Sequence, residues 1–213
     1  MNKSLKMKNL YKLYNINFNY HVNGNDIKVL KNINLEINKN ERVAIIGESG
    51  SGKTSLLMLM SGLEKPTTGS IFFNNEDFST ISEEKRTKIR RKKIGLIFQQ
   101  FYLIPNYTAL ENVMFPMQIN RINNEKKKAN LILSDIGLAN RMNNLPSELS
   151  GGEQQRVAIA RAISFNPEII LADEPTGNLD RKNTELVSDL LIEYSYKKKI
   201  SLILVTHNMS LAK

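Results

Sequence analysis

Hydrophobic and polar residues alternate along the first part of the chain. Large apolar side chains recur at mostly even spacing with polar residues between them, a pattern typical of strands with one buried and one solvated face. The segment at 22–26, Val-Asn-Gly-Asn-Asp, interrupts this pattern with turn residues. We therefore predict antiparallel strands joined near this segment. Their apolar positions are Phe18, Tyr20, Val29, Ile33, Leu35 and Ile37.

Four short runs of consecutive apolar residues follow. Such runs are typical of strands in a parallel sheet that is covered on both faces. Helix-like segments lie between them, so the alternation predicts an α/β layered core. The predicted strands occupy residues 42–46, 94–98, 168–172 and 200–205, and the predicted helices occupy residues 53–62, 82–91, 151–164 and 180–197.

The strand pattern disappears between residues 107 and about 144. Two helical segments are expected there, one begun by Thr108 and one that carries Leu131, Ile132, Ile136 and Leu138. We interpret residues 100–164 as a helical subdomain inserted into the sheet domain. With 213 residues, 41% of them hydrophobic, and no repeat, the chain is expected to form one domain over residues 1–213.

Composition narrows the possible chemistry. The chain has no cysteine and two histidines, which excludes disulfides and thiolate metal sites and leaves little for a histidine-built metal centre. Four lysines lie in the first thirteen residues, but no apolar run follows that would form a signal peptide or span a bilayer. We therefore expect that the chain does not cross a membrane.

The formal net charge of +9 is compatible with nucleic acid, anionic lipid or a polyphosphate ligand. Charge alone does not choose among these partners. Much of the excess lies in the basic runs at 85–93, 126–128 and 197–199, which we expect to be solvated helix faces or turns.

The segment at 47–54, Gly-Glu-Ser-Gly-Ser-Gly-Lys-Thr, fits the phosphate-binding pattern G-x-x-x-x-G-K-[ST] between a predicted strand and a predicted helix. Its backbone N–H groups and the helix N-terminus would surround phosphates. Lys53 would add a charge at the β and γ phosphates, and Thr54 would offer its hydroxyl to Mg²⁺. The predicted nucleotide-binding residues here are Gly47, Glu48, Ser49, Gly50, Ser51, Gly52, Lys53, Thr54 and Ser55.

An acidic pair, Asp173 and Glu174, follows the predicted strand at 168–172. The carboxyl ends of strands are where α/β sheets bind ligands. Asp173 would hold Mg²⁺ through water, and Glu174 would polarise the attacking water. Alone, such a pair is more often a solvated loop or a helix cap. Together with a phosphate loop it predicts a nucleotide hydrolase or kinase built on a P-loop NTPase (RecA-like) core.

The segment at 149–162 begins Leu-Ser-Gly-Gly-Glu-Gln-Gln-Arg. Ser150 and Glu153 form an S-x-x-E capping box, and the two glycines between them would clear side chains from the helix start so that it can approach an anion. This segment resembles the signature of ATP-binding-cassette (ABC) ATPases. The order of phosphate loop, glutamine, signature, acidic pair and histidine is also that family's order, over nearly the whole chain.

The resemblance implies further site residues. In this family the signature contacts the γ-phosphate of ATP bound to a second subunit, a role carried here to Ser150, Gly151 and Gly152. Gln99, after the predicted strand at 94–98, matches the residue that senses the γ-phosphate and Mg²⁺ and links the core to the helical lobe.

Three more positions match family residues. His207 matches the histidine that contacts the γ-phosphate and keeps the catalytic geometry. Asp180 matches a loop that crosses the dimer interface. Tyr20 matches the aromatic residue that stacks on adenine, although Phe18 competes for that role. The catalytic set implied is therefore Glu174, His207, Lys53 and Gln99, with ATP and Mg²⁺ as cofactors and with Thr54, Gln99 and Asp173 at the metal.

The segments at 103–113 and 172–180 look specifically like the small ATPases of lipoprotein-releasing, macrolide-exporting and cell-division complexes. That group implies a homodimer at the cytoplasmic face of the inner (cell) membrane, bound peripherally to a separate integral permease. Residues 106–118 are where the permease is expected to dock, and no nucleic acid is expected.

Relatives usually continue past the histidine for a further strand and helix, so we expect a shortened C-terminal end. Two alternatives are a soluble ABC ATPase that acts on DNA or ribosomes, and a binding module that uses ATP only to dimerise.

Overall fold

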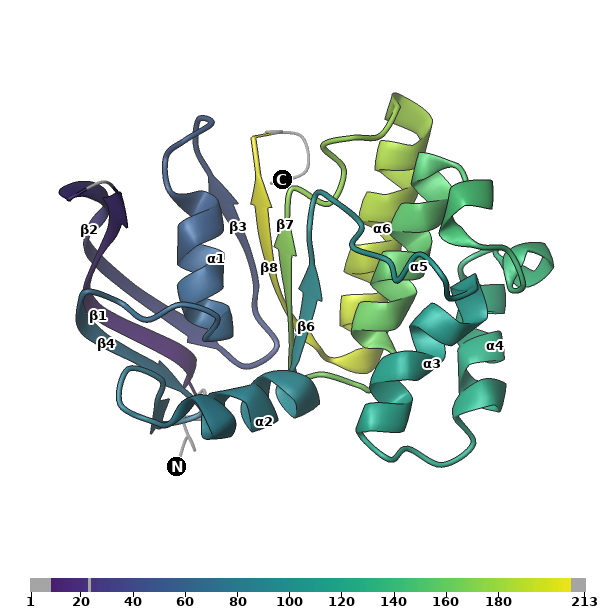
Figure 1. Cartoon of the computed structure of the whole chain (residues 1–213), viewed down its shortest axis with the longest axis horizontal. Helices are drawn as coiled ribbons and strands as arrows, with labels where there is room; N and C mark the ends of the chain where they lie inside the picture. The colour runs from purple at the N-terminus through teal and green to yellow at the C-terminus, as the bar shows by residue number, and fades with distance from the viewer. Residues whose placement is uncertain (1–8, 23, 208–213) are drawn as a thin grey trace, which may run out of the picture.

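The computed structural model describes residues 9–22 and 24–207, which form two β-sheets and a group of helices (Figure 1). The predicted antiparallel strands are confirmed as β1 (Asn9–Val22) and β2 (Asn25–Asn38). Val22 pairs with Asn25 across the predicted turn, whose residue Asn23 lies outside the described residues. Two strands that the sequence pattern did not predict, β4 (Thr68–Phe73) and β5 (Glu76–Asp77), complete a sheet of order β2-β1-β4-β5.

The four apolar runs form the predicted parallel sheet. Its strands are β3 (Arg42–Ile46), β6 (Ile94–Ile97), β7 (Ile169–Asp173) and β8 (Ser201–Thr206), in the order β3-β8-β7-β6. Every neighbouring pair is parallel, so the carboxyl ends of all four strands meet at one edge. All residues of β7 and β8 are buried, which explains why apolar residues fill most positions and why the polar residues Asp173, Ser201 and Thr206 stand at the strand ends.

Alternate residues of β7 serve different cores. Ile169 and Leu171 pack with the antiparallel sheet and with α1 (Lys53–Ser61), which lies between the two sheets in Figure 1. Ile170 and Ala172 face the opposite side, toward α5 (Gly151–Ile163) and α6 (Arg181–Lys198). The parallel sheet is therefore covered on both faces, and the loops at its carboxyl edge are left to form a site.

The remaining helices are α2 (Glu83–Lys93), α3 (Ala109–Ile119) and α4 (Glu125–Asp135), with short 3₁₀ segments at Ala139–Arg141 and Pro146–Glu148. As predicted, Thr108 begins α3 and forms a capping box with Glu111. A separate core unites α3, α4 and the outer face of α5, as expected for an inserted helical subdomain.

The second predicted helix is shorter than the pattern indicated. It ends at Asp135 because Gly137 adopts φ +75°, a left-handed conformation that reverses the chain, and the N–H of Leu138 bonds to the carbonyl of Leu133. Ile136 and Leu138 are still buried in the helical core. Leu131 is 56% exposed, so the apolar pattern does not predict burial at this position.

One basic run is also less solvated than expected. Arg86, in the 85–93 run, is only 5% exposed, because its side chain extends from α2 onto Gly62 at the end of α1. Within the described ranges, none of the helices has the length and apolar character needed to span a membrane.

Candidate nucleotide site

The phosphate loop joins the end of β3 to the start of α1 at the carboxyl edge of the parallel sheet. Gly52 precedes α1 with φ +89°, and a Cβ there would lie 2.9 Å from Cδ2 of Leu30. Glycine is therefore required both by the backbone angle and by the approach of β2. No side chain caps α1, so its first N–H groups are free to bind an anion and carry the positive end of the helix dipole.

Lys53 is nearly buried and is held across the loop. Its Nζ donates hydrogen bonds to the carbonyl oxygens of Gly47 at 2.8 Å and Glu48 at 2.7 Å. It also lies 3.9 Å from Oε1 of Glu174, with side-chain exposures of 7% and 18%. The ammonium is therefore fixed between the phosphate loop and the acidic pair.

Asp173 ends β7 in a buried position. Burial raises the pKa of its carboxyl group, while a hydrogen bond with Thr54 and the charge of Lys53 act against that rise. Its Oδ1 is buried and has no hydrogen-bond partner in the described part of the chain. A buried carboxylate oxygen without a partner is costly, so this atom is suited to a ligand that replaces the missing interaction.

Glu174 turns away from the strand direction with φ +43°. Its N–H still bonds to the carbonyl of Val205 at 2.9 Å, which keeps it at the sheet edge. Its Oε2 lies 3.0 Å from Nδ1 of His207, which follows β8. Neighbouring parallel strands thus bring together two residues that are 33 positions apart in the sequence.

These groups line a cavity of about 790 Å³. The structure brings the following predicted residues to it: Tyr20, Glu48, Ser49, Gly50, Gly52, Lys53, Thr54, Ser55, Gln99, Asp173, Glu174 and His207. Val29, which sequence reasoning treated only as a strand residue, lines it as well. The sequence feature that could have placed Val29 at the cavity is its position on the strand that pairs with the strand carrying Tyr20.

Tyr20 and Phe18 were both candidates for the residue that stacks on adenine, and the exposed fractions of their side chains distinguish them. Phe18 is 5% exposed and packs edge-on against Tyr20, with the ring centroids 4.8 Å apart. Tyr20 is 39% exposed, and its hydroxyl lies 3.4 Å from Oγ of Ser55. Tyr20, not Phe18, therefore presents an aromatic face to the cavity.

If Tyr20 stacks on the base of a nucleotide, Tyr20→Ala is expected to weaken nucleotide binding by roughly 5- to 150-fold, because one base-aromatic stack contributes about 1–3 kcal/mol. Tyr20→Phe keeps the ring and should bind within about twofold of the parent protein. Titration calorimetry with ATP measures both. Equal losses in the two variants would point to the hydroxyl near Ser55 rather than to stacking.

Gln99 is held at the cavity by a residue that the sequence did not single out. Its Nε2 donates to Oδ1 of Asn178 at 3.3 Å, and Nδ2 of Asn178 donates to the carbonyl of Gln99 at 3.1 Å. A Cβ on Gly177 would lie 2.8 Å from Nε2 of Gln99, so glycine permits this close approach. The loop after Glu174 thus positions Gln99.

Six predicted residues do not line the cavity. Gly47 and Ser51 belong to the backbone of the phosphate loop, where Gly47 accepts the Lys53 hydrogen bond. The signature residues Ser150, Gly151 and Gly152, together with Asp180, lie elsewhere on the chain. Within a single chain the predicted site is therefore incomplete.

The signature helix begins as predicted, since Ser150 and Glu153 form the expected capping box. Gly152 also has a packing role within the chain. A Cβ on Gly152 would lie 2.3 Å from Oδ1 of Asn183, so Gly152 makes room for α6. Gly151 is open, with Cζ of Phe101 at 3.8 Å as its nearest neighbour.

Asp180 belongs to the same helix contact. It caps α6 by accepting hydrogen bonds from the backbone N–H and the side-chain amide of Asn183, both at 2.8 Å. Those bonds lower the pKa of its carboxyl group. Asn183 therefore joins the starts of α5 and α6, a role that the sequence did not indicate.

The side chains next to the phosphate loop that could bind a metal ion offer oxygen atoms and no thiol, which fits Mg²⁺. Thr54 and Asp173 offer hard oxygen atoms next to the phosphate loop, and one of those oxygens is the buried Oδ1 without a partner. No group of three or more His, Cys, Asp or Glu side chains suited to a metal occurs within residues 9–22 and 24–207. Mg²⁺ needs no such group, because it commonly uses one or two carboxylates together with substrate phosphates and water.

The parallel sheet, the phosphate loop and the acidic pair with its histidine define a P-loop nucleoside-triphosphate hydrolase. The ABC transporter family matches residues 30–177. The lipoprotein-releasing system ATP-binding protein LolD of Francisella tularensis subsp. holarctica (strain OSU18) is 50% identical over 190 residues, covering 88% of this chain and 82% of that protein. LolD of Hydrogenovibrio crunogenus is 45% identical over 186 residues, covering 86% and 81%.

Solved structures of ABC ATPases have the same fold as this chain. The dimeric ATP-binding cassette MJ0796 in a post-hydrolysis state, bound to ADP and Pi, is 42% identical and superposes with a TM-score of 0.89 over 95% of this chain and 90% of that one. The chain belongs to the ABC transporter family. It is an ATPase subunit that binds and hydrolyses ATP. The predicted family, fold class and ATPase activity are thereby confirmed.

Proposed function

We propose that this chain powers a lipoprotein-releasing ABC system from the cytoplasmic face of the inner membrane. The observation that carries the proposal is the 45–50% identity to two LolD proteins over 86–88% of the chain, which includes the helical subdomain as well as the nucleotide motifs. A partner permease contacts surfaces outside the nucleotide site, so similarity over the whole chain is a better guide to the partner than the motifs alone.

Hydrolysis is assigned to the groups around the cavity. Glu174 orients a water molecule and accepts its proton while the water oxygen bonds to the γ-phosphorus and the bond to the β-phosphate oxygen breaks. His207, 3.0 Å from Glu174, holds that carboxylate in place. Lys53 and the N–H groups of the phosphate loop bind the phosphates, and Gln99 contacts the γ-phosphate. Mg²⁺, held by Thr54 and Asp173, would neutralise charge on the β and γ phosphates.

We further propose that two copies share each ATP. Ser150, Gly151 and Asp180 are exposed and lie outside the cavity of their own chain, although the family resemblance assigns them to the nucleotide. Gly151 leaves the start of α5 open, and the start of a helix is suited to an anionic ligand. The similarity to the dimeric cassette MJ0796 supports a second copy as the source of that ligand.

A mixing experiment tests the shared site. Gly151→Asp puts a negative charge where the γ-phosphate is expected, at an open position where an acidic residue also suits a helix start. It should bind ATP but lose hydrolysis, and Lys53→Ala should lose hydrolysis through weak binding. A mixture of the two is expected to regain part of the parent rate, because each mixed dimer contains one intact site. A mixture as inactive as its components would contradict the shared site.

The permease is expected to dock in a groove between the core and the helical subdomain. The groove has a volume of about 670 Å³ and is lined mainly by apolar side chains, among them Phe98, Tyr102, Ile104, Phe115 and Ile119. It includes part of the 106–118 segment expected from the sequence. Tyr102 is 63% exposed and Phe115 is 36% exposed, and with the other apolar side chains of the groove they form a patch of the kind that marks interaction sites.

The test is affinity capture from detergent-solubilised native membranes with Glu174→Gln protein and Mg-ATP. Mass spectrometry should identify a multi-span protein with a large extracytoplasmic domain. The matched control, Glu174→Gln with Phe115→Asp, should bind ATP equally well but capture much less of that protein. Recovery of ribosomes or DNA-binding complexes without a membrane protein would instead favour a soluble ABC ATPase.

A further inference from the structure

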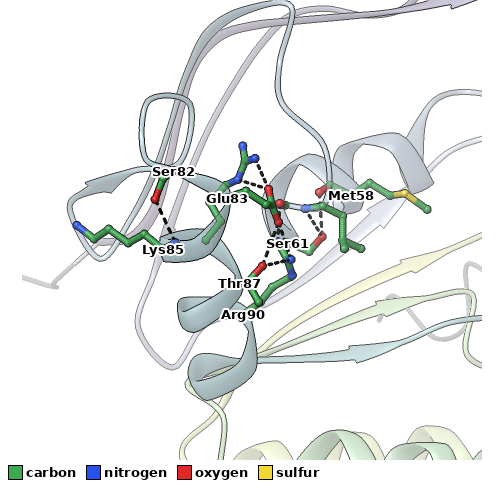
Figure 2. Close-up of polar contacts among 10 residues, drawn as sticks. Met58, Ser61, Ser82, Glu83, Lys85, Thr87 and Arg90 are labelled. Atoms are coloured by element: carbon green, nitrogen blue, oxygen red, sulfur yellow. Dashed lines mark hydrogen bonds and ion pairs between the residues drawn. The ribbon is translucent and has the colours of Figure 1, made fainter.

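The nucleotide site and the groove are connected through α2. Arg86 and Arg90 of this helix contact Gly62, the residue that ends α1, and the N-terminal end of α1 carries Lys53. Figure 2 shows Glu83, Thr87 and Arg90 of α2 gathered against the segment of α1 that carries Met58 and Ser61. Arg90 and Thr87 also line the groove. One short helix therefore contacts both the end of the phosphate-loop helix and the groove.

Arg90 makes the contact with α1. Its Nη1 donates to the carbonyl oxygen of Gly62 at 2.7 Å, and its side chain is 17% exposed. Gly62 ends α1 in the left-handed conformation, with φ +70°. The last carbonyl groups of a helix lack partners within the helix and carry the negative end of its dipole. A guanidinium at this position therefore fixes the end of α1.

Glu83 holds Arg90 in that position. Its Oε1 accepts from Nη2 of Arg90 at 2.9 Å and from Thr87 at 3.1 Å, and its Oε2 pairs with Arg86. These hydrogen bonds lower the pKa of Glu83 to about 2, so the carboxylate is charged throughout the physiological range. Nη2 of Arg90 also donates to Oγ1 of Thr87 at 2.8 Å.

A second side chain of α2, that of Arg86, also contacts the residue that ends α1. A Cβ on Gly62 would lie 3.0 Å from Phe78 and 3.4 Å from Cδ of Arg86, so the stem of Arg86 lies directly on the helix end. Ser61 is fully buried, and its hydroxyl bonds to the carbonyl of Met58. Side chains of α2 therefore hold the C-terminal end of α1, the helix whose N-terminal end carries Lys53.

We propose that Arg90, oriented by Glu83, is a positioning residue for ATP hydrolysis that couples the groove to the phosphate loop through α1. An occupant of the groove that displaces Arg90 alters the tilt of α1 and with it the N–H groups that bind phosphate. By linkage, ATP binding alters the groove in return. The role of the groove rests on the proposed permease docking, but the coupling is a property of the ATPase subunit alone.

The absence of cysteine from the sequence permits a direct measurement. Ile119→Cys, at the groove and 41% exposed, carries an environment-sensitive fluorophore in Glu174→Gln protein. Addition of Mg-ATP should change its emission. Arg90→Ala should reduce this change at least about fivefold and weaken ATP binding about tenfold, as expected when a charged hydrogen bond that positions the site is lost. Arg90→Lys, which can still donate to Gly62, should restore part of both.

Lys88→Ala is the matched control, because Lys88 lies on the solvated face of the same helix, where it pairs with Glu84 at 2.7 Å. It should behave as the parent. If Arg90→Ala does not fold, Glu83→Gln tests the same link, since it weakens the support of Arg90 without removing it. An Arg90→Ala protein with a lower melting temperature but an unchanged ATP affinity and emission response would overturn the proposal, as would a parent that shows no response. Failure to capture a permease would leave this result unaffected.

Discussion

Replacement of Glu174 by Gln is expected to slow ATP hydrolysis by about 10²- to 10⁴-fold, the usual contribution of a positioned general base. The amide keeps the shape of the side chain but cannot accept the proton of the attacking water. ATP affinity should change little, because Glu174 adds negative charge near the phosphates rather than binding them. Phosphate release at saturating Mg-ATP measures the rate, and equilibrium binding of ATP measures the affinity.

The same variant should accumulate as an ATP-bound dimer, since hydrolysis is the step expected to separate the two copies. Size-exclusion chromatography with light scattering, with and without ATP, detects that species. His207→Ala is the informative companion, because it removes the partner at 3.0 Å while leaving the carboxylate. Near-normal hydrolysis by Glu174→Gln would remove Glu174 from the mechanism.

Replacement of Lys53 by Ala is expected to weaken ATP binding by about 10- to 10⁴-fold. Hydrogen bonds to charged groups contribute about 1.5–3 kcal/mol each, and Lys53 is placed to make one or two of them to the phosphates. The substitution also removes the cation 3.9 Å from Glu174 and the two bonds that hold the phosphate loop. Hydrolysis should be undetectable at ATP concentrations that saturate the parent protein.

The control for Lys53 is Lys65→Ala, which removes an exposed lysine soon after the same helix. Its ATP affinity should match that of the parent. A melting temperature measured without nucleotide separates loss of binding from loss of folding. If Lys53→Ala bound ATP normally, the assignment of the cavity as a phosphate site would be wrong.

Much of the fold was predictable because the responsible forces act locally. Consecutive apolar residues in β7 and β8 indicated strands buried on both faces, and S-x-x-E at Ser150 indicated a capped helix start. β4 was missed because much of its stability comes from pairing with β1, more than fifty residues earlier in the chain. The length of α4 was overestimated because a left-handed glycine ended a helix whose apolar pattern continued.

The candidate site was predictable to a similar extent. The phosphate loop, the acidic pair and Gln99 each follow a predicted strand, and the parallel topology then places them at one edge. Periodicity placed Val29 on a strand but not at the cavity, and it carried no information about Asn178 or Asn183. Their roles come from side-chain contacts between segments that are far apart in the sequence.

The sequence by itself determined the strand and helix pattern, the phosphate loop and the order of motifs that identifies an ABC ATPase, because each motif is a short run of neighbouring residues and their order can be read along the chain. Only the tertiary structure decided that Tyr20 rather than Phe18 reaches the cavity, that Gly152 makes room for Asn183, and that Arg90 joins the end of α1 to the groove. These outcomes depend on how separate elements pack, and packing selects among side chains that a local pattern treats as equivalent.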